Sequence, residues 1–200
     1  MIPAKVYRVQ YFQEKLVCPT CHEEDDTTII AAKAPRPLFP HGLASPDMVA
    51  TVMYNKGSLY LPFYRQAKDW QLNGVPLPRE TQARWFNQGA LVYLEPICQR
   101  LHEELLHREV IHADEVPCQV LHEEGKAATS KSYIWIYLSG TDGRPPVILY
   151  DYCPGRTGDF PIEFLQGFSG IIHCDGYSAY GRIEDVLLAC CLAHCRRDGR

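Results

Sequence analysis

The sequence lacks the features that mark several protein classes. No apolar run approaches the ~20 residues that a membrane helix needs, and no basic region followed by an apolar one opens the chain, as in a secretory signal. We therefore expect a cytoplasmic protein that has no membrane partner. Its content of 46% hydrophobic and 22% charged residues is near the globular average, which argues against intrinsic disorder.

The sequence also has no excess of positive charge. The formal net charge is −4, and residues 111–200 hold 8 Lys and Arg against 12 Asp and Glu. Any binding of DNA would therefore depend on local basic patches or on metal ions, because the chain provides no overall positive field.

Zinc-type cysteine motifs are scarce. The nine cysteines include one pair with zinc-ligand spacing, Cys18 and Cys21 in "CPTC". A closed structural zinc site needs four ligands, and the sequence has no second motif of this kind. The pair is therefore either half of a zinc site or carries no metal. The other cysteines are expected to be reduced thiols, most of them buried.

The first half of the chain is predicted to be mainly helical after a proline-rich linker at residues 33–46. Ser45 is a good N-cap, and the residues after it favour a helix start. Two further helices separated by Asn73-Gly74 give an outline like a helix-turn-helix, with Arg84 on the second one. The alternative is an ordinary helical hairpin. Residues 91–108 have apolar residues at helical spacing and are predicted to be a packing helix.

From residue 109 the pattern changes to that of strands. Three runs rich in β-branched and aromatic residues, separated by turn-forming segments, predict an antiparallel meander. A short helix, a fourth strand ending near Asp175, a brief connection and a fully buried fifth strand follow. This order is that of a ribonuclease H-like α/β fold.

Two acids stand at points of interest in that fold. Asp114 lies within the first strand and Asp175 at the end of the fourth, and in this fold the two strands are parallel neighbours. Facing carboxylates either share a proton or hold a divalent metal such as Mg²⁺. Asp175 could instead be a turn or N-cap residue. Asp114 is predicted to be buried, which is costly unless it is paired or liganded, and Glu115 is predicted to face solvent or support the site.

Basic residues near this region are candidate contacts to DNA phosphates. Lys126 and Lys131 lie at the predicted hairpin tip, and Arg196 and Arg197 in "HCRR" follow the fifth strand, near the edge with Asp175. The alternatives are a solvated turn for the lysines and a helix start with exposed side chains for the arginines.

Taken together, these motifs resemble those of the transposases of the insertion sequence 66 family. The similarity runs through nearly the whole chain in the family's order. The matching stretches are "CPTC", "PHGLASPDMVA", "LPFYRQ", "LPRETQARW", "HADEVPCQVL", "KSYIWIY", "VILYDYCPGRTGD", "FLQGFSGIIHCDGYSAY" and "CLAHCRR".

The resemblance implies a DNA transposase that acts on transposon ends and target DNA and is a homo-oligomer at full length. It implies a partial zinc-binding segment at residues 1–36, a helical region at 42–108 and a ribonuclease H-like catalytic core at 109–200. Asp114 and Asp175 match two of the three acids, two Asp and one Glu, that hold Mg²⁺ (or Mn²⁺). Cys18 and Cys21 match the later cysteine pair of the zinc segment.

The chain also departs from the family pattern. Val116 stands where the family usually has Thr. The earlier cysteine pair would precede Met1, and the catalytic Glu would follow Arg200. The resemblance therefore implies a fragment truncated at both ends that does not cleave DNA by itself. The alternative is a transposon-derived remnant that serves only as a DNA-binding or interaction module.

Overall fold

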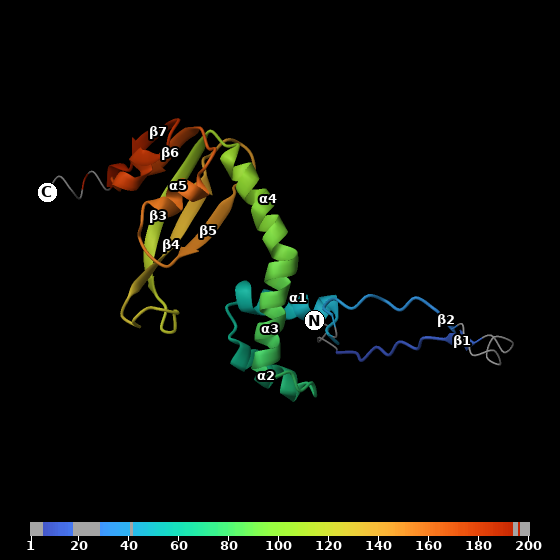
Figure 1. The fold of residues 1–200 in the computed structure, drawn as a ribbon. Coiled ribbons are helices and arrows are strands. Elements are labelled where there is room, and N and C mark those ends of the chain that lie inside the picture. Colours follow the sequence, from blue (N-terminus) through green and yellow to red (C-terminus); the bar gives the residue numbers. More distant parts are fainter. Residues whose placement is uncertain (1–5, 18–28, 41, 194–195, 197–200) are drawn as a thin grey trace. The chain divides into compact units, whose positions relative to one another are not determined.

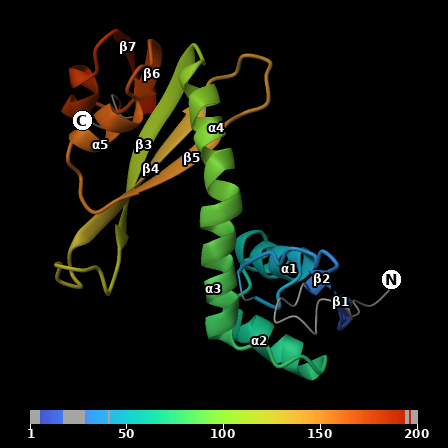
Figure 2. The same cartoon turned by 45° about the vertical axis from the view of Figure 1, so that its right-hand side comes forward.

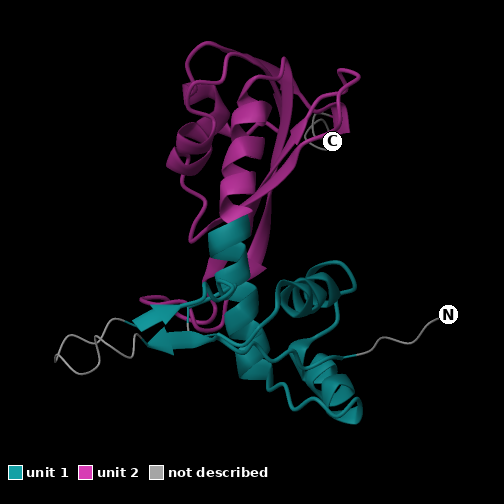
Figure 3. Cartoon of the chain, turned by 90° about the vertical axis from the view of Figure 1, so that its right-hand side faces the viewer, with its two compact units in different colours: residues 1–93 teal, residues 94–200 magenta. Residues whose placement is uncertain are grey.

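The computed structural model describes residues 6–17, 29–40, 42–193 and 196. The chain divides into two compact units, residues 1–93 and 94–200, which Figure 3 shows in different colours. Cys18, Cys21 and Arg197, three of the predicted functional residues, lie outside the described residues.

The described part of the first unit contains a short antiparallel pair of strands and three α-helices. The strands are β1 (Lys15–Val17) and β2 (Ile29–Ala31). The helices are α1 (Pro46–Gly57), α2 (Phe63–Leu72) and α3 (Arg79–Gly89). The predicted start of α1 is confirmed, because the Ser45 side chain accepts a hydrogen bond from the backbone N–H of Met48 at 3.2 Å.

Helices α2 and α3 begin in the same way. Each follows a Leu-Pro pair, and each has a buried glutamine five residues after the leucine. Gln66 donates a hydrogen bond to the carbonyl of Leu61, and Gln82 to the carbonyl of Leu77, both at 3.0 Å. The shared pattern Leu-Pro-x-x-x-Gln thus fastens the start of each helix to the loop before it, since a buried carbonyl needs a hydrogen-bond partner.

The second unit contains a five-stranded mixed sheet. Its strands are β3 (Val110–Gln119), β4 (Lys131–Ser139), β5 (Ile148–Cys153), β6 (Gly170–Cys174) and β7 (Val186–Cys190). Their order in the sheet is β5-β4-β3-β6-β7 (Figure 1). The predicted antiparallel meander of β3, β4 and β5 is confirmed, and β6 lies parallel to both β3 and β7. This mixed α/β arrangement is consistent with a ribonuclease H-like core.

One face of this sheet forms the main hydrophobic core. Helices α4 (Glu95–Leu106) and α5 (Asp159–Phe164) lie against it (Figure 2). Phe164 of α5 stacks on Tyr137 of β4 with ring centroids 3.9 Å apart. The fully buried members of the core, all at 0% exposure, are Leu105, Ile111, Trp135, Tyr137, Leu165, Ile172 and Tyr180. The opposite face is more exposed and includes Tyr150, which is 68% exposed.

Two apolar segments that were predicted to be buried are exposed over most of their length. The run expected to pack in residues 91–108 is divided between a π-helical turn (Ala90–Leu94) and α4. Of its apolar positions only Leu105 is fully buried, and Leu91 is 70% exposed. Strand β7 was expected to be fully buried, yet Leu187 is 71% exposed. Among the described strands β7 is the last in the order of the sheet, so it has a strand neighbour on one side only.

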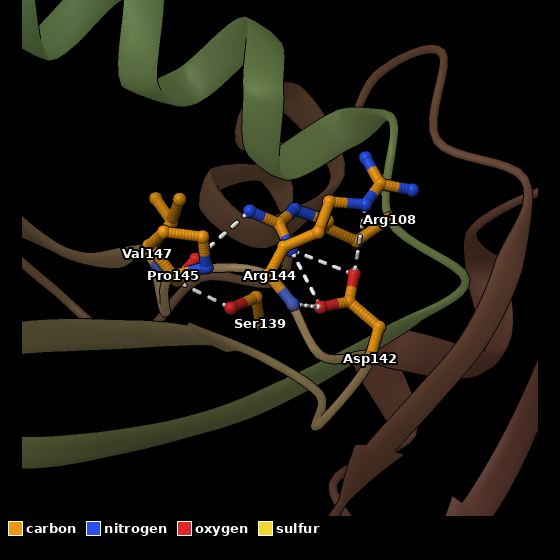
Figure 4. A network of polar contacts seen from close by, with 6 residues as sticks. All are labelled: Arg108, Ser139, Asp142, Arg144, Pro145 and Val147. Carbon is orange, nitrogen blue, oxygen red and sulfur yellow. Dashed lines mark hydrogen bonds and ion pairs between the residues drawn. The ribbon is translucent and has the colours of Figure 1, made fainter.

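A buried arginine ties the start of β3 to the β4–β5 connection (Figure 4). The side chain of Arg108 is 5% exposed and donates two hydrogen bonds to the carboxylate of Asp142, at 2.8 and 2.6 Å. A third goes to the carbonyl of Pro145 at 3.0 Å. These hydrogen bonds, together with one from the backbone N–H of Arg144, lower the pKa of Asp142 from its ordinary value of 3.8.

We expect Asp142→Asn to lower the free energy of unfolding at pH 7, because it leaves the Arg108 charge buried without its partner. A lowered folded-state pKa means that the stabilisation is present above pH 3.8 and is lost as pH falls through the lower value. Urea unfolding at several pH values should therefore show a difference between the two proteins that shrinks below about pH 4. Asp159→Asn, which removes an exposed ion pair with Arg182, serves as control and should have little effect at any pH.

Candidate metal-binding site on adjacent parallel strands

Asp114 lies in the middle of β3, opposite Ile136 of β4. The prediction that it is buried is wrong, because the residue is exposed. Side chains alternate along a strand, and Ile111 and Ala113 occupy the core, so Asp114 belongs to the other face of the sheet. Its carboxylate accepts a hydrogen bond from the backbone N–H of Glu115 at 2.9 Å.

Asp175 directly follows β6 and is half-buried. Its carboxylate accepts a hydrogen bond from the backbone N–H of Tyr177 at 2.9 Å. This contact is an Asx-turn, in which a short acidic side chain replaces a backbone carbonyl and reverses the chain. Asp175 is therefore a turn residue, as the alternative interpretation of the sequence predicted. This contact uses only one of its two carboxylate oxygens.

The last parallel pair between β3 and β6 lies two residues before the two acids. It joins His112 with His173. Asp114 follows His112 within β3, and Asp175 follows the end of β6. The two imidazoles meet with their Nδ1 atoms 3.0 Å apart. Burial lowers the pKa of His112, and the neighbouring His173 lowers it further. A lowered pKa favours a neutral imidazole at position 112.

Of the two alternatives predicted for Glu115, the one in which its side chain faces solvent is wrong. Its side chain is only 3% exposed and forms an ion pair with Arg156, whose Nε donates to Glu115 Oε1 at 2.7 Å. Burial raises the pKa of Glu115, while the hydrogen bond and charge of Arg156 act in the opposite sense. The negative charges of Asp175 and Asp114 raise the pKa of Glu115 further. Both aspartates are therefore close enough to Glu115 to affect its ionisation.

The donor set fits a hard divalent cation. Carboxylate oxygens are the ligands that Mg²⁺ prefers, and Mg²⁺ commonly keeps several waters and binds only one or two carboxylates. Within the described ranges, no three His, Cys, Asp or Glu side chains form a group that could hold a metal. In this part of the chain the two aspartates would therefore act as a pair, with water or substrate oxygens completing the coordination.

The candidate DNA-binding residues lie on several elements. Arg84 is exposed on α3, Lys131 is exposed at the start of β4, and Arg196 is exposed beyond β7. Lys126 forms an ion pair with Glu123 at 3.3 Å. The structure therefore leaves three of these side chains accessible and gives the fourth an internal partner.

Sequence reasoning missed two features of this region. The first is the histidine pair, which was detectable because His112 and His173 each precede one of the acids by two residues. The second is the ion pair of Glu115 and Arg156. The sequence shows neither that the Glu115 side chain turns inward nor that its partner lies 41 residues away.

The mixed α/β fold is consistent with the ribonuclease H-like core of a transposase, and comparison with known proteins gives the family. The model for "Transposase IS66 family" matches residues 41–200. The chain therefore belongs to the IS66 family of transposases, as its motifs predicted.

Three proteins from Sinorhizobium fredii (strain NBRC 101917 / NGR234) are similar to this chain. The uncharacterized protein y4qI is 33% identical over 186 residues, covering 84% of this chain and 34% of its own length. The uncharacterized proteins y4hP and y4jD are each 26% identical over 98% of this chain, covering 36% and 40% of their own lengths. The chain thus spans between a third and two fifths of these relatives. Among the described residues no helix is long and apolar enough to cross a membrane.

Proposed function

We propose that this chain carries part of the catalytic core of a DNA transposase that cleaves and joins strands by metal-dependent phosphoryl transfer. Asp114 and Asp175 are its metal-binding acids. The observation that supports this most is the parallel pairing of β3 with β6, whose last pair, His112 with His173, precedes each acid by two residues. The ribonuclease H-like order of the strands supports it as well.

In this proposal the residues of the chain orient the reacting groups. When bound, divalent cations of this kind activate an attacking oxygen and stabilise the leaving oxygen of a phosphodiester. Asp114 supplies an exposed carboxylate, and Asp175 supplies one whose direction is fixed by the turn to Tyr177. The histidine pair tethers the two strands immediately before the acids.

We further propose the three-part organisation that the family resemblance implies. Residues 1–36 contain the zinc-type pair Cys18 and Cys21, residues 42–108 are a helical region, and residues 109–200 are the core. DNA ends and target DNA are the partners, and the full-length protein is a homo-oligomer. The phosphate contacts are assigned to Arg84, Lys126, Lys131, Arg196 and Arg197.

The second candidate function is a non-catalytic DNA-binding or interaction module. It is favoured by one observation: among the residues that the structure describes, no group of three His, Cys, Asp or Glu side chains could hold a metal. On either proposal, we expect the 200-residue polypeptide alone to leave DNA strands uncut.

An experiment on DNA binding separates the two functions. The affinity for a DNA duplex is measured by fluorescence anisotropy at constant ionic strength, with Mn²⁺ and with EDTA. A cation held by Asp114 and Asp175 would bind phosphate, so Mn²⁺ should strengthen binding relative to the double variant Asp114→Asn/Asp175→Asn. Equal responses of the two proteins to Mn²⁺ would instead support the non-catalytic module.

A further inference from the structure

The carboxylates of Asp114 and Asp175 are connected by a continuous series of contacts. The backbone N–H of Glu115 donates to Asp114, and the Glu115 side chain accepts from Arg156 at 2.7 Å. The Tyr177 hydroxyl donates to the carbonyl of Arg156 at 2.8 Å, and the Tyr177 backbone N–H donates to Asp175. Four hydrogen bonds through three intervening residues therefore link one acid to the other.

Arg156 is the central residue of this series. It comes from the loop between β5 and α5, whereas Glu115 directly follows Asp114 and Tyr177 is two residues after Asp175. Its guanidinium lies over the Tyr177 ring, 4.5 Å from the centroid, and pairs with the nearly buried Glu115. A buried carboxylate is costly unless it is paired, so this contact fixes the guanidinium against β3.

The loop that carries Arg156 is also fixed to the segment that follows Asp175. A Cβ atom at Gly158 would lie 2.6 Å from the Cβ of Ala179, which shows how closely the two backbones approach. Ala179 belongs to a 3₁₀ helix, Ser178–Arg182. The loop thus contacts β3 at one point and the turn after β6 at several.

We propose that Arg156, held by Glu115 and Tyr177, is a positioning residue that fixes Asp114 and Asp175 relative to each other and so sets the affinity of this pair for divalent cations. The inference rests on the proposed metal-binding function of the two acids. Arg156 acts through the neighbouring residues and needs no contact with the cation itself.

The size of the expected effect follows from comparable metal sites. Residues that orient metal ligands through hydrogen bonds typically contribute a factor of 10–100 in metal affinity. Lysine at position 156 keeps the positive charge but loses the planar guanidinium that both pairs with Glu115 and stacks on Tyr177. Arg156→Lys should therefore weaken Mn²⁺ binding by about tenfold.

The test is calorimetric titration of the chain with Mn²⁺, with urea unfolding of each variant in parallel. Tyr177→Phe removes only the hydroxyl that donates to Arg156, keeps the ring, and should also weaken binding severalfold. It carries the test if Arg156→Lys fails to fold. Arg182→Lys is the matched control, because Arg182 is another arginine of this region with an acidic partner, and it should bind Mn²⁺ like the unsubstituted chain.

The outcomes separate this inference from the proposed function. If binding requires both acids but Arg156→Lys and Tyr177→Phe retain full affinity, the positioning role is wrong and the metal site stands. The positioning role is also wrong if Arg156→Lys and Tyr177→Phe lose no more Mn²⁺ affinity than Arg182→Lys does. If the unsubstituted chain shows no Mn²⁺ binding that depends on the acids, the metal site is wrong and the positioning role fails with it.

Discussion

Asp175→Asn is expected to abolish saturable Mn²⁺ binding by this chain, and Asp114→Asn is expected to do the same. Each substitution keeps the shape of the side chain and removes its negative charge. Where two protein carboxylates hold a cation, the loss of either removes half of the negative charge that attracts it and leaves one carboxylate ligand, so we expect binding too weak to saturate. Isothermal titration calorimetry of the two variants and the unsubstituted chain measures the effect.

Asp159→Asn is the control for this experiment. Asp159 is also an aspartate of the second unit, but it pairs with Arg182 and its side chain is 75% exposed. It should leave the Mn²⁺ titration unchanged. Full affinity in either Asp114→Asn or Asp175→Asn would remove that residue from the site, and full affinity in both would rule out the site altogether.

Trp135→Ala is expected to destabilise the second unit by about 3–5 kcal/mol. Trp135 is completely buried in β4 and packs near Tyr177 and Tyr180, with ring centroids 6.1 and 6.2 Å away. Removing its indole leaves a cavity that a close-packed core fills only in part. Urea unfolding followed by circular dichroism measures the change in unfolding free energy.

A matched substitution on the opposite face tests whether burial is the cause. Tyr150 belongs to the neighbouring strand β5 and is 68% exposed. Tyr150→Ala should change the unfolding free energy by no more than about 0.5 kcal/mol. Similar losses for Trp135→Ala and Tyr150→Ala would mean that the hydrophobic core does not lie on the face described above.

The strands of the second unit were predictable because their sequences carry strong local signals. The run "KSYIWIYLS" alternates buried and half-buried residues over nearly all of β4, and turn-forming segments separate it from its neighbours. Burial was harder to predict in two places. Leu91 and Leu187 have the spacing or composition of core residues, but whether they are covered depends on what packs against them, which local pattern does not determine.

The sequence singled out the two candidate acids but did not predict the contacts that hold them. The stretch "VIHADEV" has apolar residues at both odd and even positions, so its alternation does not reveal which side faces the core. The structure assigns Ile111 and Ala113 to the core, which leaves Asp114 exposed and turns Glu115 inward. The partner of Glu115 depends on the tertiary path of the β5–α5 loop, which no local rule predicts.

The central claim is that Asp114 and Asp175 together hold one divalent-cation site. Anomalous diffraction from crystals of this chain grown with Mn²⁺ tests it most directly. We predict an anomalous peak about 2 Å from a carboxylate oxygen of each aspartate, and its loss in Asp175→Asn crystals. An anomalous peak beside only one of the two aspartates would contradict the account. So would a structure in which the two carboxylates are too far apart to share an ion.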